Sequence, residues 1–239
     1  MIAWKHKIGL LISARNQVIE PDFNQYRPAG VSVHSTRIRK DQDFTNVDTM
    51  NTLQASARDA AAVIAQAGVD IAVFGCTAAS FLHGGGQDIQ LARSLQQAAG
   101  IPVITTATAV VTALQALELK RLTIITPYID ELNEREGAFF RNNGFDVKRL
   151  KGMDIEQTSK LPGLTPAEIY HFCIKYFDSG SDGLFISCTN IRAMAVIPYL
   201  EMHLGKPVIT SNQASLWCAL RQSGNNDHCE QAGLLLKEH

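Results

Sequence analysis

Short apolar runs alternate with longer amphipathic segments along this chain, which is the pattern of an α/β protein. The short runs are bounded by polar or turn residues and predict strands, over 7–13, 31–37, 101–105, 122–126, 147–150 and 206–210. The longer segments carry apolar residues at helical spacing and predict helices, over 49–67, 90–99, 108–119, 130–142, 165–178, 189–203 and 214–222. Two further strands belong to a stretch that occurs twice.

The repeated stretch covers residues 69–77 and 181–189. Each copy contains an Asp, a short apolar run, a small residue and then Cys-Thr, with the cysteines at positions 76 and 188. An apolar run of this length is typical of a buried strand in a parallel sheet. Each Cys-Thr pair is therefore expected just past the C-terminal end of a strand, where open α/β sheets bind their ligands.

A second pair of similar segments supports a duplication of half the chain. Residues 100–106 read GIPVITT and residues 205–211 read GKPVITS, and both pairs are separated by nearly the same number of positions. We therefore predict two similar lobes, with Cys76 and Cys188 facing each other across the cleft between them. The predicted N-terminal lobe contains 1–108 plus 208–239, and the predicted C-terminal lobe contains 109–207.

Composition restricts the class of protein. The chain has 239 residues, is 46% hydrophobic and has a net charge of −1, so it supports a large core and gives no electrostatic reason to bind nucleic acid or an anionic membrane. No apolar run reaches transmembrane length, and Met1–Lys7 does not begin a signal peptide. Five cysteines without paired spacing favour free thiols in a reducing cytoplasm.

Two polar side chains follow predicted strands, and two readings remain open for each. Asn16, in the loop after the first strand, is suited to hydrogen-bond a substrate carboxylate, or it shapes a turn. Tyr128 directly follows another strand and either contacts a ligand or packs as an aromatic residue with a solvated hydroxyl. Cys173 and Cys218 lie among apolar residues of predicted helices and are expected to be inert.

Together, several short motifs resemble the aspartate/glutamate racemase superfamily. They are the two Cys-Thr strand ends, Asn16 with the Glu-Pro-Asp at 20–22, Thr-Pro-Tyr at 126–128 and Ser-Asn-Gln at 211–213. Within it, the chain is most similar to the branch of maleate cis–trans isomerases and arylmalonate decarboxylases, over essentially its whole length. The resemblance implies two pseudo-symmetric Rossmann-like lobes, no metal, no organic cofactor and a catalytic cysteine from each lobe. It implies substrate contacts at Asn16, Thr77, Ala78, Tyr128 and Thr189.

The number of cysteines separates the activities within this branch. The resemblance implies that decarboxylases have Gly in place of the first cysteine, whereas this chain has both Cys76 and Cys188. An isomerase or racemase is therefore favoured. One departure is that residues 155–160 (IEQTSK) lack the Asp-Asn pair of the isomerases, so a contact to one substrate carboxylate is expected to differ.

The favoured hypothesis is a cofactor-independent isomerase of a small unsaturated dicarboxylate, of the maleate-to-fumarate type. A thiolate is a strong nucleophile, so Cys76 would add to the alkene while Cys188 exchanges a proton. A racemase or decarboxylase of an amino acid or malonate-type acid is the alternative within enzymes. A two-lobed protein that binds a small acid without turnover is the alternative outside them. We expect a homo-oligomer, a dimer or tetramer.

Overall fold

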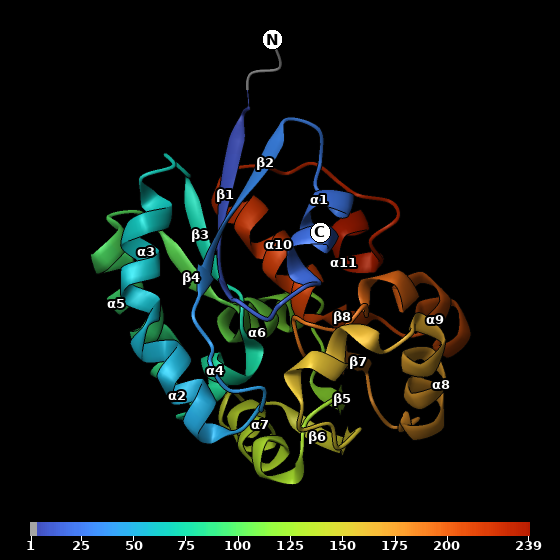
Figure 1. The fold of residues 1–239 in the computed structure, drawn as a ribbon. Helices are drawn as coiled ribbons and strands as arrows, with labels where there is room; N and C mark the ends of the chain where they lie inside the picture. The colour runs from blue at the N-terminus through green and yellow to red at the C-terminus, as the bar shows by residue number, and fades with distance from the viewer. Residues whose placement is uncertain (1–3) are drawn as a thin grey trace.

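Two four-stranded parallel sheets form the framework of the protein (Figure 1). The computed structural model describes residues 4–239, so the first three residues of Met1–Lys7 lie outside the described part. The first sheet contains, in spatial order, β2 (Val31–Ile38), β1 (His6–Ser13), β3 (Ile71–Phe74) and β4 (Val103–Thr105). The second sheet contains β6 (Asp146–Gly152), β5 (Arg121–Thr126), β7 (Gly183–Ile186) and β8 (Val208–Thr210). The predicted α/β fold with parallel sheets is confirmed.

Both sheets have the same strand order. The register between the last two strands, β3 with β4 and β7 with β8, is also the same. Phe74 of β3 lies opposite Thr105 of β4, and Ile186 of β7 lies opposite Thr210 of β8. The two cysteines of the repeated stretch therefore follow equivalent strand ends. All residues of β3 and β7 are buried, as expected for strands covered on both faces.

Helices cover the two sheets, and those of the first half connect its strands (Figure 1). They are α1 (Ile19–Tyr26), α2 (Val47–Ala55), α3 (Ala57–Ala65), α4 (Thr77–Phe81), α5 (Gln87–Ala99) and α6 (Thr106–Ala116). The second half contains α7 (Asp130–Asn142), the 3-10 turns η1 (Thr158–Gly163) and η2 (Met194–Val196), α8 (Pro166–Tyr176), α9 (Ile197–Leu204), α10 (Ser211–Gln222) and α11 (Leu234–Glu238). None of the helices in the described part of the chain combines the length and apolar character that crossing a membrane requires.

Helices α6 and α10 pack against each other in the centre of the molecule and join the two halves (Figure 1). Each follows the last strand of its sheet, and each is capped by the threonine that ends that strand. The Thr105 side chain accepts a hydrogen bond from the Thr108 amide, and the Thr210 side chain accepts one from the Gln213 amide. The buried apolar residues of both sheets form one continuous core.

The border between the lobes is partly fixed by strand pairing. β8 pairs with β7, so residues 208–210, which the sequence analysis assigned to the N-terminal lobe, lie in the second sheet. From residue 211 on, α10 contacts β3 and α1 of the first half as well as α6 and β8. The assignment of this last segment to the N-terminal lobe stays a prediction.

Two predicted helices are wrong in their extent. The helix predicted over 49–67 is divided into α2 and α3 at Ser56. The helix predicted over 189–203 begins only at Ile197, after a turn and η2, and Pro198 lies in its first turn rather than at a kink. The turn forms because Thr189 and Asn190 bind the other half of the molecule: Thr189 Oγ1 donates to the Gly75 carbonyl at 3.1 Å, and Asn190 Oδ1 accepts from the Gln17 amide at 2.8 Å.

Candidate active site

Cys76 lies between the end of β3 and the beginning of α4. It has an extended backbone (φ −146°, ψ 106°) as the N-cap of α4, and its Sγ lies 3.8 Å from Met50 Sδ. Burial raises the pKa of the Cys76 thiol, whereas the Ala79 amide, the positive charge of Lys40 and the Ala78 amide lower it. The thiol is therefore held beside groups that stabilise its anion.

The small residue before Cys76 is required by close packing. A Cβ on Gly75 would lie 2.8 Å from Ile12 Cγ2 and 2.9 Å from Ile19 Cδ1, so a larger side chain would displace the core of the first sheet. Gly75 also offers its carbonyl to Thr189. The first Cys-Thr pair is thus held directly against the second.

Cys188 has a different backbone from Cys76. Its φ of +102° is in the left-handed region, an outlier for an L-residue that is typical of functional sites. Its amide donates to Ser211 Oγ at 3.0 Å, and its Sγ accepts from the Asn190 amide at 3.3 Å. Burial raises the pKa of the thiol to about 12, against the lowering effect of the Asn190 amide and the Tyr128 hydroxyl. Cys76 directly precedes a helix, whereas Cys188 is followed by a turn.

Both thiols line one cavity, built from the strand ends of both sheets. The cavity also contains every other residue predicted for the site, so the structure brings together Asn16, Cys76, Thr77, Ala78, Tyr128, Cys188 and Thr189.

Cys173 and Cys218 lie outside this cavity, on α8 and α10, with 0% and 2% of their surface exposed. Burial raises the pKa of Cys173 to about 12 and that of Cys218 to about 11. These two thiols are apolar packing groups.

Asn16 combines the two readings that its sequence left open. Its Oδ1 accepts from the amides of Val18 and Ile19 at 3.0 and 3.1 Å, so it shapes the turn into α1. Its Nδ2 donates to Thr189 Oγ1 at 3.0 Å, which joins the two lobes beside the cavity. Asn16 is therefore fixed in orientation and lines the site at the same time.

A hydrogen-bond chain connects the two cysteine segments. Thr77 Oγ1 donates to Ser211 Oγ at 2.9 Å, and the same oxygen accepts the Cys188 amide. The hydroxyls of Thr77 and Thr189 are thus used within the protein. The amides of Thr77 and Ala78 open α4 and have no acceptor within it, because the first turn of any helix lacks one. These amides are available as donors for an anion.

Tyr128 is almost completely buried, with 2% of its surface exposed. Burial raises its pKa well above its usual range, and the ionised form of Cys188 would raise it further. Its hydroxyl therefore keeps its proton and is a donor that lowers the pKa of Cys188. The reading of Tyr128 as an aromatic with a solvated hydroxyl is excluded by this burial.

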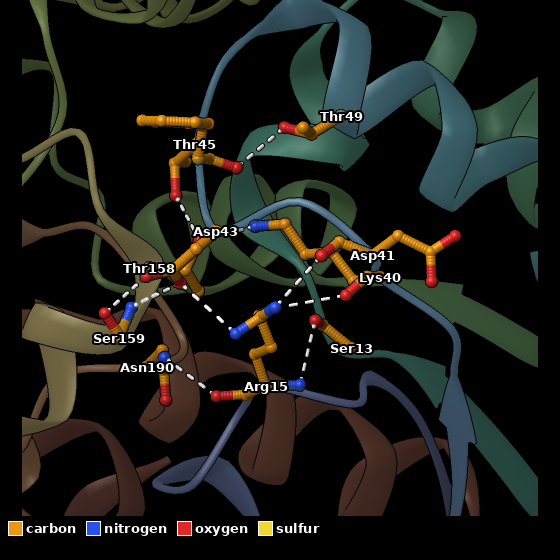
Figure 2. A network of polar contacts seen from close by, with 11 residues as sticks. Ser13, Arg15, Lys40, Asp41, Asp43, Thr45, Thr49, Thr158, Ser159 and Asn190 are labelled. Atoms are coloured by element: carbon orange, nitrogen blue, oxygen red, sulfur yellow. Dashed lines mark hydrogen bonds and ion pairs between the residues drawn. The ribbon is translucent and has the colours of Figure 1, made fainter.

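The loop that follows β2 contributes to the site, although its sequence did not predict this. Figure 2 shows Lys40 and Asp43 of this loop meeting Thr158 and Ser159 of the other lobe. Lys40 Nζ donates to Thr158 Oγ1 at 2.6 Å, and both residues line the cavity. The sequence signal was weak, because a lysine beside Arg39 is typical of a solvated loop.

The described residues contain no group of three or more His, Cys, Asp or Glu side chains that could hold a metal ion. The groups with chemical capability in the lining of the cavity include two thiols, a buried phenol and a lysine.

Comparison with known proteins identifies relatives over the whole chain. The model of the family described as arylmalonate decarboxylase matches residues 37–236. The arylmalonate decarboxylase of Bordetella bronchiseptica is 31% identical over 150 residues, which is 62% of each chain. The maleate isomerase of Pseudomonas putida is 26% identical over 97% of each chain. The solved structure of the Nocardia farcinica maleate cis–trans isomerase, a mutant with a covalently bound succinylcysteine intermediate, has a TM-score of 0.92 at 20% identity, over 98% of this chain and 99% of that one.

Proposed function

This chain belongs to the arylmalonate decarboxylase family, and we propose that it is a cofactor-independent cis–trans isomerase of a small unsaturated dicarboxylate, of the maleate-to-fumarate type. The observation that carries the proposal is the pair of thiols, Cys76 and Cys188, at equivalent strand ends of one cavity. The relation to a maleate isomerase over 97% of the chain supports it.

Covalent addition is the first step. Cys76 reacts as a thiolate, and its Sγ forms a bond to one alkene carbon while the π electrons move to the neighbouring carbon. The Cys188 thiol donates its proton to that carbon, which gives a saturated adduct on Cys76. A succinylcysteine, the adduct bound in the Nocardia farcinica structure, has this composition.

Rotation and elimination complete the reaction. The former double bond is now single, so the two carboxylates turn to opposite sides. The Cys188 thiolate then removes the proton it gave, the electrons re-form the double bond, and the bond between carbon and Cys76 Sγ breaks. The trans acid leaves, and both cysteines return to their starting protonation.

Hydrogen-bond donors stabilise the negative charge that spreads onto a substrate carboxylate during addition. The amides of Thr77, Ala78 and Thr189, the Tyr128 hydroxyl and the Asn16 amide are the groups that we assign to this role. Their fixed orientation in a buried site supports the assignment, because preorganised donors need no rearrangement during the step. A substrate carboxylate would compete for Asn16 Nδ2 with Thr189 Oγ1, its present acceptor.

Decarboxylation of a malonate-type acid is the second candidate. The 31% identity to the arylmalonate decarboxylase of Bordetella bronchiseptica favours it. A single protonating thiol is sufficient for that reaction, so it gives no role to the second cysteine of the cavity. Racemisation of an amino acid would use both thiols, as opposed base and acid. Binding without turnover would require neither.

Proton NMR in deuterated water distinguishes these activities. The purified protein is incubated separately with maleate, aspartate, hydantoins and substituted malonates. We expect the olefinic signal of maleate to be replaced by that of fumarate. Exchange of an α-proton without isomerisation would instead identify a racemase, loss of CO2 a decarboxylase, and unchanged spectra with saturable binding a binding protein.

We further propose a reducing, cytoplasmic location and a homo-oligomer. All five cysteines are free, which a reducing compartment preserves. An apolar groove beside α8 and α9, with Tyr199 and Met202 61% and 78% exposed, is suited to contact a second copy. Light scattering coupled to size exclusion tests this, and a mass of 26.2 kDa, that of one chain, would exclude a stable oligomer.

A further inference from the structure

Lys40 places a positive charge in the wall of the cavity that holds both thiols. It follows β2, and only 9% of its surface is exposed. Among the described residues that line the cavity, it is the one Lys or Arg, and no Asp or Glu accompanies it. Its charge acts on both thiols, since the ionised forms of Cys76 and Cys188 raise its pKa against the lowering effect of burial.

The charge of Lys40 has no counter-ion among the described residues. Its Nζ donates to the neutral hydroxyl of Thr158 at 2.6 Å, and no carboxylate oxygen in residues 4–239 lies within ion-pair distance of it. Asp43 is the acid with a charge effect on Lys40, but its carboxylate accepts from the Ser159 amide at 2.9 Å and pairs with Arg15 at 3.5 Å. An ammonium group has three donors, so Lys40 has capacity left for an anion.

The attachment of the loop after β2 to η1 does not require the positive charge of Lys40. Thr45 Oγ1 lies 3.0 Å from Thr158 Oγ1, and an antiparallel bridge joins Phe44 to Gln157. With the Asp43–Ser159 contacts, these bonds hold the loop after β2 against η1 without Lys40. A neutral donor would serve Thr158 equally well, whereas a buried ammonium without a counter-ion loses its hydration and is destabilising. A bound anion would remove this cost.

The geometry points to Lys40 as the group that binds the second carboxylate of a short dicarboxylic acid, and thereby selects dianions over monoanions. One carboxylate meets the amides at the start of α4, and the other meets Lys40 on the wall formed by the loop after β2 and η1. This inference rests on the proposed function, because it deepens the substrate class of the same site. It predicts that monoesters and monocarboxylic acids bind poorly although their reacting carbons are the same.

Protection of Cys76 from alkylation measures this binding without requiring turnover. The rate of iodoacetamide labelling at Cys76 is followed by peptide mass spectrometry at increasing concentrations of maleate, of its monomethyl ester and of crotonate. The half-protecting concentration is obtained for wild type, Lys40→Gln, Lys40→Met and Lys160→Gln. Glutamine keeps a donor for Thr158, methionine fills the buried volume without one, and Lys160 is an exposed lysine two residues after Thr158.

We expect maleate to protect the wild type at a concentration about tenfold or more below that of its monoester. In Lys40→Gln and Lys40→Met this preference for maleate should fall to less than about threefold. The half-protecting concentrations of the monoester and of crotonate should change by less than about twofold. Lys160→Gln should behave as wild type. Circular dichroism confirms that each variant is folded. Two different substitutions of Lys40 are used so that the result does not depend on how one particular side chain packs.

A preference for maleate that survives in the folded Lys40 variants overturns the inference. It is also overturned if these variants change the rate of Cys76 labelling in the absence of any acid but leave the half-protecting concentrations unchanged. Lys40 would then act on the Cys76 thiolate alone. If dicarboxylates protect in a Lys40-dependent way but no acid is isomerised, the proposed function fails and the carboxylate site stands.

Discussion

Burial governs the thiols of the site at the scale of single residues. It raises the pKa of Cys76 and brings that of Cys188 to about 12, so Cys188 holds its proton near neutral pH. Such a thiol is a poor nucleophile until its proton leaves, but it is a suitable proton donor to a carbanion. The amides at α4 and the charge of Lys40 favour ionisation of Cys76. These differences support the proposed addition by Cys76 and the proposed proton exchange by Cys188.

Serine substitutions test these assignments. Cys76→Ser should reduce turnover of the acid identified by NMR at least about a thousandfold, because a hydroxyl adds poorly to an alkene near neutral pH. Cys188→Ser should lose about a hundredfold or more, because a hydroxyl exchanges protons poorly there. Cys173→Ser, a buried thiol on α8, is the control and should keep wild-type kcat. Substantial activity in Cys76→Ser would favour acid–base chemistry at Cys188 alone.

Glu136 makes the stability of the protein dependent on pH. Burial raises its pKa to about 8 from an ordinary value of 4.5, although the neighbouring Ser187 hydroxyl opposes the shift. Between these values the folded chain holds a proton that the unfolded chain has lost. Its contribution to the free energy of unfolding is therefore complete below pH 4.5 and falls as the pH rises to about 8, by about 5 kcal/mol.

Glu136→Gln removes this titration. The variant should unfold at a higher temperature than wild type at pH 8.5 and differ little at pH 5, as measured by circular dichroism. Glu134→Gln, an exposed neighbour on α7, should follow wild type at both pH values. Equal melting curves of wild type and Glu136→Gln across this range would contradict the raised pKa.

Elements rather than single residues position the site, and their local signals differ in strength. The helix predicted over 130–142 is found as α7 with the same bounds, and α8 begins with a capping box between Thr165 and Glu168. Local capping and apolar spacing were sufficient there. The turn after Cys188 was not predictable, because Thr189 and Asn190 bind groups more than a hundred residues away. Lys40 was missed for the same reason: its burial depends on Thr158.

The contact between the loop after β2 and η1 lies beside the cavity, and we expect it to limit access to Cys76. Asp43→Ala removes the carboxylate that accepts from the Ser159 amide and hydroxyl, so the loop should detach more often. We expect iodoacetamide to label Cys76 about threefold faster or more, because local opening of the loop exposes the thiol. The melting temperature should change little, because the rest of the protein stays folded. Asp41→Ala, an exposed acid of the same loop, is the control. Unchanged labelling would show that solvent reaches Cys76 by another route.

The two halves form one unit at the scale of the whole molecule. The apolar core extends through both sheets, and α6 and α10 pack together between them. Duplication of the strand order was visible in the repeated Cys-Thr and Gly-x-Pro-Val-Ile-Thr segments. The packing of the last helix across both halves was not, because its apolar faces do not specify which sheet they cover.

A shared core predicts cooperative unfolding. Fluorescence of Trp217, which is buried on α10, and far-UV circular dichroism should report the same urea midpoint. The Trp4→Phe variant removes the exposed second tryptophan, so that the fluorescence reports α10 alone. Two separated transitions would mean that the lobes fold independently.

The central claim is that Cys76 forms a covalent adduct with its substrate. Without the proton exchange of Cys188, elimination is slowed, so the Cys188→Ser variant should accumulate the adduct. The measurement is mass spectrometry of this variant after incubation with maleate, followed by peptide mapping. The account predicts a mass gain of one molecule of acid, located on Cys76 and absent from Cys173 and Cys218. An unmodified Cys76 in a variant that binds maleate, or an adduct on another residue, would contradict it.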